Sequence, residues 1–451
     1  MASIIKRNSK YSVVYYADVD GKRKQIWETF SSHKEATKRK AEVELEIEDG
    51  IFIAPNRQTI SVFMDDFVAL YGEENWALST YSSNVALINN YIKPMIGEEL
   101  VQNITPKFID QFYKQLKKTK SAAGLTRNMK SVYVGASVPD NEHKLLRCAF
   151  GQAVRWEIIK RNPFELVKPP RVSYKPRDIW TSDMIRKALD ECTDSRLYIA
   201  MNLAFACSLR IGEILGLTWD NVHIDDGDIA RDDAYVYIDK ELQRASLEAI
   251  KTLDQKDIIR TFPSVKKNPT TIVVLKTPKT QSSVRRVWLP KTVAYILREF
   301  REKQNTLKEL LQDEYEDYNL VIPMNSGRPC EDRVITESFQ RLRERVGLPN
   351  VVFHSLRHSS TTYKLKLNKG DLKATQGDTG HAEIDMITKV YAHILDEDRK
   401  LNAQKFEAAF YANPDLRDVK PPQENVLDIK TLIEQLQRSP ELANALAELI
   451  K

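Results

Sequence analysis

Hydrophobic residues in the first 55 positions change from a strand-like to a helical pattern. Residues 11–17 are rich in aromatic and β-branched side chains, which predicts a β-strand. Asp20-Gly21 is a typical two-residue hairpin turn, and residues 22–30 predict the returning strand. Ser31 or Ser32 can cap a Lys-, Arg- and Glu-rich helix that we expect to run to about Glu48. We therefore expect a small module of sheet and helix over residues 1–55.

Between positions 59 and 170 the hydrophobic residues recur every three or four positions, as in amphipathic helices. Thr105 before Pro106 is a good helix start, because proline is tolerated at the first helical position. Residues 124–140 lack this period and are expected to form a loop. Proline-marked linkers border the region at residues 51–57 and near Pro163, Pro169 and Pro170. The apolar positions expected for the four helices are Val62, Phe63, Phe67 and Leu70; Tyr81, Val85, Ile88 and Tyr91, capped by Ser79 or Thr80; Phe108, Ile109, Phe112 and Leu116; and Leu145, Leu146, Ala149, Phe150, Ala153 and Trp156.

Residues 175–411 combine helical periods with one strand-rich stretch. Arg210 lies in an apolar run that predicts a single helix on both sides of it. Strands are expected at residues 235–239, 257–262, 271–276 and 284–289, and the long segment 241–268 has the character of an insertion. Beyond position 412 the chain is polar, and a short amphipathic helix is expected after Pro421-Pro422.

The expected fold class is therefore α+β multidomain. It comprises the module 1–55, an all-α domain over 59–170, a mainly α domain with a small β-sheet over 175–411, and a tail over 412–451. The length of 451 residues agrees with two to four domains.

Composition narrows the function classes only slightly. The formal net charge is +5, but basic pairs and triplets occur in every region, as in proteins that meet DNA phosphates on several surfaces. The four cysteines have no paired spacing, and Cys148 and Cys207 lie in apolar runs, so we expect buried thiols in a reducing compartment. The sequence has no apolar targeting core or membrane-length run, and we expect a soluble, cytoplasmic bacterial protein.

Six polar residues of the third domain have the chemistry that transfer of a phosphodiester to a tyrosine requires: Arg210, Lys279, His354, Arg357, His381 and Tyr391. An arginine in an apolar run needs a partner, which for Arg210 is either Glu213 or a phosphate. His354 and Arg357 are three positions apart and can share one helix face. Fixed donors at the phosphate oxygens are worth about 3 kcal/mol each in such a reaction. Tyr391 is the candidate nucleophile. The six residues include no carboxylate cluster or Cys/His spacing that would hold a metal.

The order and spacing of these residues closely resemble the tyrosine recombinase, or phage integrase, family. The resemblance is most specific in Gly380-His381 and in Tyr391-Ala392-His393, and it spans nearly the whole chain. It implies site-specific recombination of a bacterial mobile element through a 3′-phosphotyrosyl intermediate, with no cofactor or metal. The module 1–55 resembles arm-binding domains, and the helical domain resembles core-binding domains.

The resemblance also implies roles for individual residues and partners. Arg210 and Arg357 would hold the phosphate, Glu213 would orient Arg210, and His354 would act as the base. His381 would be a further catalytic residue. The general acid would be Lys279, with Lys276 as the alternative. Four protomers would act on two DNA duplexes, with an accessory excision or DNA-bending protein as a candidate partner. The tail would contact a neighbouring protomer, and Lys22, Arg23 and Lys24 would contact DNA from the N-terminal hairpin.

Two other functions remain open from the sequence. A type IB-like topoisomerase shares the arginine, lysine, histidine and tyrosine chemistry, but it would not need an arm-like module. A DNA-binding regulator could keep the fold without the reaction, but it would not need Tyr391.

Overall fold

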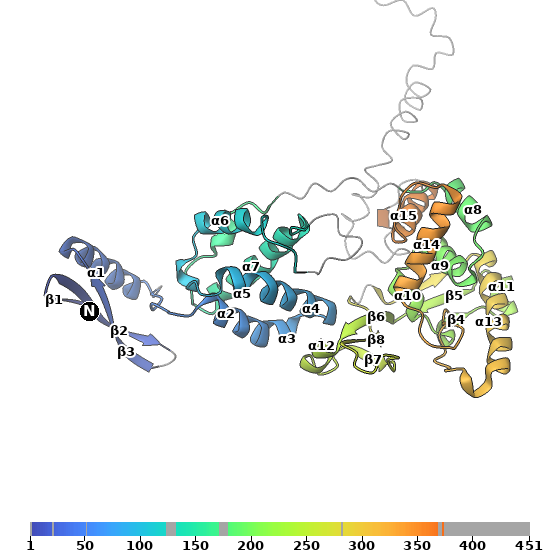
Figure 1. Cartoon of the computed structure of the whole chain (residues 1–451), viewed down its shortest axis with the longest axis horizontal. Coiled ribbons are helices and arrows are strands. Elements are labelled where there is room, and N and C mark those ends of the chain that lie inside the picture. The colour runs from blue at the N-terminus through green and yellow to red at the C-terminus, as the bar shows by residue number, and fades with distance from the viewer. Residues whose placement is uncertain are drawn as a thin grey trace, which may run out of the picture. The chain divides into compact units, whose positions relative to one another are not determined.

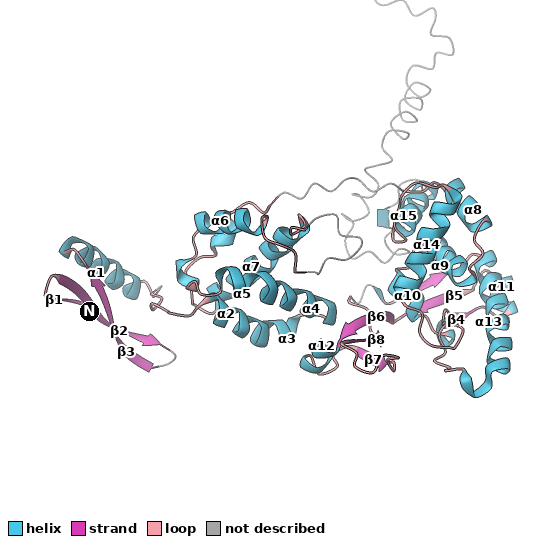
Figure 2. Cartoon of the chain, in the orientation of Figure 1, coloured by secondary structure: helices cyan, strands magenta, loops and turns pink. Residues whose placement is uncertain are grey.

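The computed structural model describes residues 2–19, 22–50, 52–122, 132–170, 179–280, 283–368 and 372–373. Helices predominate, and the strands of this part of the chain form three small antiparallel sheets (Figures 1 and 2). The α+β multidomain class is thus confirmed. His381, Tyr391 and the tail 412–451 lie outside the described residues.

The N-terminal module is a three-stranded sheet covered on one face by a helix. Its elements are β1 (Ser3–Arg7), β2 (Lys10–Val19), β3 (Lys22–Phe30) and α1 (His33–Glu48). Val19 pairs with Lys22, the register expected for a two-residue turn. Ser32 caps α1 by accepting a hydrogen bond from the Lys34 amide. The sequence did not indicate β1, because this five-residue strand is mostly exposed and lacks a hydrophobic pattern.

The second region, residues 60–167, is helical as expected. Ile60, Phe63, Met64 and Phe67 form the buried face of its first helix. The prediction for Leu70 was wrong, because a π-helical turn follows and moves this side chain to the surface, where it is 67% exposed. The elements are α2 (Ile60–Phe67), η1 (Val68–Gly72), α3 (Glu73–Asn75), α4 (Leu78–Leu87), η2 (Ile88–Ile92), α5 (Lys93–Ile96), η3 (Val101–Asn103), α6 (Pro106–Leu116), α7 (Ser137–Arg155) and η4 (Pro163–Leu166).

The expected helix caps, apolar positions and buried cysteines are confirmed in part. Thr105 caps α6 as predicted, but the residue before α4 is Ala77 rather than Ser79 or Thr80. Val62, expected on an apolar face, is 53% exposed. Cys148 is exposed rather than buried, because it lies on the side of α7 opposite its buried positions, whereas Cys207 is buried.

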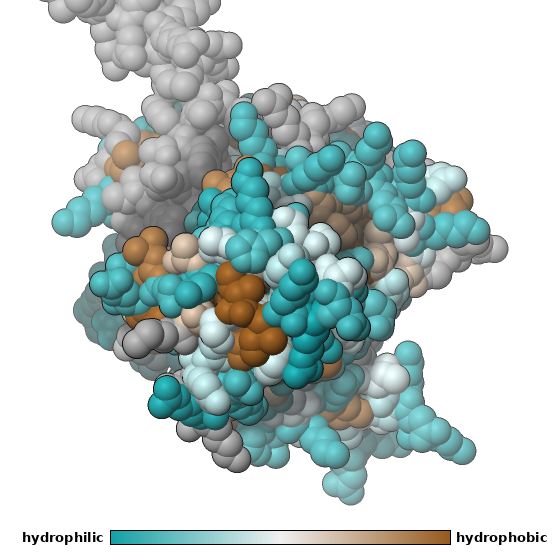
Figure 3. All heavy atoms as spheres, turned by 90° about the vertical axis from the view of Figure 1, so that its left-hand side faces the viewer, coloured by the Kyte–Doolittle hydropathy of each residue, from teal (hydrophilic) through white to brown (hydrophobic). Residues whose placement is uncertain are grey.

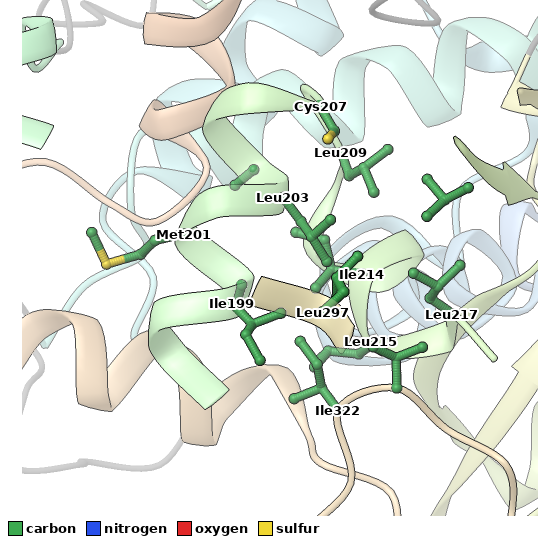
Figure 4. Close-up of a cluster of buried hydrophobic side chains, with 14 of the residues drawn as sticks. Ile199, Met201, Leu203, Cys207, Leu209, Ile214, Leu215, Leu217, Leu297 and Ile322 are labelled. Carbon is green, nitrogen blue, oxygen red and sulfur yellow. The ribbon is translucent and has the colours of Figure 1, made fainter. Parts of the chain in front are cut away.

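The third region packs its helices around one hydrophobic core, except for α12 (Leu247–Thr252), whose Ala249 and Ile250 belong to the core of the helical second region. Leu203 and Leu209 contribute to the core of the third region before the short helix α10, and Ile214 and Leu215 contribute from that helix (Figure 4). The helices are α8 (Ser182–Asp190), α9 (Ser195–Ala206), α10 (Ile211–Gly216), η5 (Trp219–Asn221), α11 (Asp226–Ala230), α12 (Leu247–Thr252), α13 (Lys291–Leu311), η7 (Gln312–Glu314), α14 (Asp332–Val346) and α15 (Ser355–Leu367).

Two sheets occur in this region, where one small sheet was expected. One sheet has the order β4-β5-β9 and the other β6-β8-β7. The expected strands are present to within one or two residues at their ends. The insertion 241–268 supplies two further elements that the sequence did not indicate, a strand and the helix α12. The strands are β4 (Val222–His223), β5 (Tyr235–Ile238), β6 (Glu241–Ser246), β7 (Ile258–Thr261), β8 (Thr271–Lys276) and β9 (Arg285–Trp288).

Within the described ranges, none of the helices combines the length and the apolar character needed to cross a membrane.

Candidate active site

Arg210 lies at the start of α10 rather than inside a continuous helix. The single helix expected around it is wrong, because α9 ends at Ala206 and α10 begins at Ile211. Ser208, between the two helices, has a positive φ of 55°, which no helix can accommodate. The break turns Arg210 out of the helical ladder while its neighbours Leu209 and Ile214 stay in the core. Its side chain is consequently about one-third exposed.

Glu213 fixes the position of Arg210 by binding both its side chain and its backbone amide. One carboxylate oxygen lies 2.7 Å from Arg210 Nη1, and the other accepts a hydrogen bond of 2.9 Å from the Arg210 backbone amide. The carboxylate is almost completely buried. Burial opposes its ionisation, but Arg285 and Arg210 hold the pKa of Glu213 below its ordinary value. Arg210 is therefore bound to an anchored carboxylate, with part of its guanidinium still accessible.

Arg357 is a buried cation beside Arg210. It lies in the first turn of α15, is only 1% exposed, and donates a hydrogen bond to the Ser208 carbonyl. The hydroxyls of Ser208 and Ser360 are 2.6 Å apart, which joins the strained residue to α15 a second time. Burial, followed by repulsion from Arg210, lowers the pKa of Arg357 to about 9. Two guanidinium groups thus share a site in which an anion would be stabilised.

His354 is at the N-terminal boundary of α15 and its imidazole is exposed. The Arg357 amide bonds to the His354 carbonyl in the tight turn that begins the helix. The His354 ring meets the His358 ring edge to face, with centroids 4.8 Å apart. The structure therefore brings His354 and Arg357 into one helical turn, one exposed and the other buried.

The two candidate lysines differ in their surroundings. Lys276, in β8, is 2% exposed and binds Glu241 Oε1 at 3.0 Å and the Thr277 carbonyl at 2.7 Å. Lys279 is exposed in the segment after β8. A lysine held by a buried ion pair cannot readily reach a DNA oxygen, so these contacts favour Lys279 over Lys276.

Arg285 is part of the site, although it was not among the site residues expected from the sequence. Its side chain is 7% exposed, and its two terminal nitrogens lie 3.3 and 3.2 Å from the two Glu213 oxygens. The signal was present in the strand alternation: Arg285 and Val287 share the inward face of β9, whereas Arg286 stacks outside on Tyr235 and Trp288. A buried arginine in a strand needs a carboxylate partner.

In the N-terminal module the side chains alternate between the helix-covered face of the sheet and an open face. Tyr15 and Ala17 belong to the covered core, and the register places Lys24 opposite Ala17. Arg23 lies on the open face and stacks on Tyr16. Trp27 of the same face is 42% exposed, and the Arg7 guanidinium lies over its ring. The face shown in Figure 3 is largely hydrophilic, with a few hydrophobic groups. Of the expected DNA contacts, Arg23 is on the open face and Lys24 is not; Lys22 begins β3.

Comparison with known proteins agrees with this arrangement. Residues 263–398 match the phage integrase family, and residues 3–47 match an arm DNA-binding domain. The ICEBs1 integrase of Bacillus subtilis is 24% identical over 396 residues, covering 86% of this chain and 94% of its own. A XerC-like tyrosine recombinase of Caldanaerobacter subterraneus is 23% identical over 415 residues, covering 88% and 96%.

Among solved structures, the fold resembles that of the Tn1549 transposon integrase in complex with a circular intermediate DNA. The TM-score is 0.57 at 17% sequence identity, and the match covers 77% of this chain and 99% of the other. Residues 263–398 are therefore identified as a phage integrase family domain, and residues 3–47 as an arm DNA-binding domain.

Proposed function

We propose that this enzyme integrates and excises a bacterial mobile element by breaking and rejoining DNA at specific sites, with Tyr391 as the nucleophile. The observation that carries the proposal is the pair of guanidinium groups of Arg210 and Arg357. Burial disfavours the charged form of Arg357 and lowers its pKa, and Arg210 is bound to Glu213. Such a site becomes favourable once a phosphate occupies it.

The chemistry assigns one task to each group. Attack by the Tyr391 oxygen forms a bond to phosphorus and breaks the bond to the 5′-oxygen. His354 accepts the phenol proton, Lys279 protonates the departing 5′-oxygen, and Arg210, Arg357 and His381 stabilise the charge on the non-bridging oxygens. The 3′-phosphotyrosyl bond retains the energy of the phosphodiester. Attack by a 5′-hydroxyl of the partner duplex then reverses the step without a cofactor.

Two duplexes contain four strands to be cut, and each protomer supplies one nucleophile. We therefore propose that four copies act together on two double-stranded DNA segments, in the bacterial cytoplasm where this substrate is found. An accessory excision or DNA-bending protein would select the direction of the reaction. A type IB-like topoisomerase is the less favoured alternative, because it would not need the arm-like module.

A nicked suicide substrate tests the proposed reaction. It would carry the junction sequence that flanks the gene, with a nick close to the cleavage site so that the short 5′-hydroxyl fragment diffuses away. The enzyme should become covalently attached to the 3′-phosphate end of the cleaved strand, and an intact partner duplex should then be joined. Attachment without joining would indicate a topoisomerase, and binding without attachment would indicate a regulator.

We further propose that the N-terminal module binds DNA through the open face of its sheet. A strand pair can enter the major groove, and the Arg23–Tyr16 and Arg7–Trp27 stacks offer cations held in place by aromatic rings.

In the isolated module, residues 1–55, Arg23→Ala should weaken DNA binding and reduce the slope of log affinity against log salt by about one. Lys38→Ala is the matched control, because this exposed lysine is on the helix α1 that covers the other face of the sheet. Titration at several salt concentrations measures both. Equal losses for the two variants would reject the open face as the DNA surface.

The segment from residue 412 onward is proposed to contact a neighbouring protomer. The short helix expected there would have an apolar face at Leu432, Ile433 and Leu436, which would need a partner surface to be stable in water. Deletion from Pro421 should reduce recombination and synapsis by at least about tenfold, while cleavage of a single site survives, since about 1.4 kcal/mol of lost contact suffices. Gel-shift assays of paired sites and suicide cleavage separate the two effects. Equal loss of both would show that the tail serves its own protomer.

A further inference from the structure

Arg285 has two sets of contacts that lead to different parts of the site. Its terminal nitrogens bind both oxygens of Glu213, the carboxylate that holds Arg210. Its Nη1 also donates to the Ser283 carbonyl at 3.0 Å. Ser283 belongs to the segment between β8 and β9, which also carries Lys279. The buried Arg285 side chain therefore contacts Glu213, which holds Arg210 of the proposed phosphate clamp (Arg210 and Arg357). It also contacts the segment that carries the proposed general acid.

Ser283 extends this connection towards Lys279. Its amide bonds to the Thr280 carbonyl at 3.0 Å, and its hydroxyl is 2.9 Å from that of Thr280. The same hydroxyl lies 3.5 Å from Arg210 Nη1. Thr280 is the residue directly after Lys279, so the position of the lysine backbone depends on this turn. That turn depends on Ser283, whose carbonyl accepts a hydrogen bond from the buried Arg285 side chain.

We propose that Arg285 is a positioning residue that aligns Lys279 with the phosphate held by Arg210. The inference rests on the proposed recombination and on Lys279 as its general acid. Arg285 is too buried to contact DNA, so it can act on Lys279 only through Ser283, and on Arg210 only through Glu213. A general acid must lie within hydrogen-bond reach of its target oxygen, and a displacement of about 1 Å can slow a reaction by about a hundredfold. An exposed lysine on a loop therefore needs contacts, such as those of Arg285, that fix the position of its backbone.

The two routes are separable by changing the leaving group. A substrate whose scissile 5′-oxygen is replaced by sulfur releases a thiolate, which departs without a proton because thiols are far more acidic than alcohols. A defect confined to the acid should disappear on this substrate. A defect in the phosphate clamp should persist, because the non-bridging oxygens are unchanged.

The experiment compares nicked suicide substrates with oxygen and sulfur at this position, using the full-length protein. Arg285→Ala should reduce the cleavage rate about a hundredfold or more on the oxygen substrate and by less than about tenfold on the sulfur substrate. Glu213→Gln, which weakens the support of Arg210, should slow both substrates by similar factors. Arg286→Ala changes the neighbouring residue on the outer face of β9 and should leave both rates unchanged.

Arg285→Lys provides the same comparison if the alanine variant does not fold, since it keeps the charge but loses the forked geometry. An equal loss on both substrates by either Arg285 variant, or no loss on the oxygen substrate, would overturn the positioning role. Failure of the wild-type enzyme to attach to either substrate would instead reject the proposed recombination.

Discussion

Replacement of Tyr391 by phenylalanine should abolish covalent attachment to DNA while leaving DNA binding almost unchanged. The substitution removes only the phenol oxygen, which forms the bond to phosphorus. Binding depends on many phosphate contacts elsewhere on the protein and should survive. Suicide-substrate assays should show at least a thousandfold less adduct, in line with loss of an enzymatic nucleophile, and gel-shift titrations should give a dissociation constant within about threefold of the wild type.

Tyr295→Phe is the matched control for this variant. Tyr295 is 49% exposed on helix α13, and removal of its hydroxyl should affect neither binding nor attachment. A normal level of adduct from Tyr391→Phe would reject Tyr391 as the nucleophile.

Replacement of Arg357 by methionine should separate catalysis from stability. The loss of one fixed donor to the phosphate should slow cleavage by about a hundred- to a thousandfold. The DNA-free protein should nevertheless be as stable as the wild type or melt up to about 4 °C higher. Burial and the nearby Arg210 already disfavour the charged form of Arg357, whose pKa is lowered to about 9. An apolar side chain of similar volume removes that cost.

Cleavage assays and thermal melts of the DNA-free protein test both parts of this expectation. Arg341→Met on the exposed face of α14 is the control, and it should alter neither the rate nor the melting temperature appreciably. A large drop in the melting temperature of Arg357→Met would show that Arg357 stabilises the fold through its bond to Ser208. Its burial would then not be a feature that only phosphate binding makes favourable.

The elements that periodic sequence patterns predict are those held by local chemistry. Ser32 and Thr105 were recognisable as helix caps, and the Asp20-Gly21 sequence predicted the observed pairing of β2 with β3. Strand β6 was missed because its residues, from Glu241 to Ser246, have little hydrophobic alternation, and it is stabilised by pairing with the distant strand β8. Pairing between residues 25 to 35 positions apart leaves no local trace in the sequence.

The candidate site shows the same division between local and distant contacts. The Arg210–Glu213 pair was predictable because its members are three positions apart and meet at a helix start. The third member, Arg285, comes from a strand more than 70 residues later and meets Glu213 only in the folded chain. The break between α9 and α10 was also missed, since the strained backbone of Ser208 is maintained by Arg357 and Ser360 of α15.

The most direct measurement of the central claim is the identity of the bond between protein and DNA. The adduct trapped on a suicide substrate would be digested with protease and nuclease, and the modified peptide sequenced by mass spectrometry. We predict a nucleotide 3′-phosphate attached to Tyr391, with a free 5′-hydroxyl on the released strand. A link to another residue, or a 5′-phosphate link, would contradict the account.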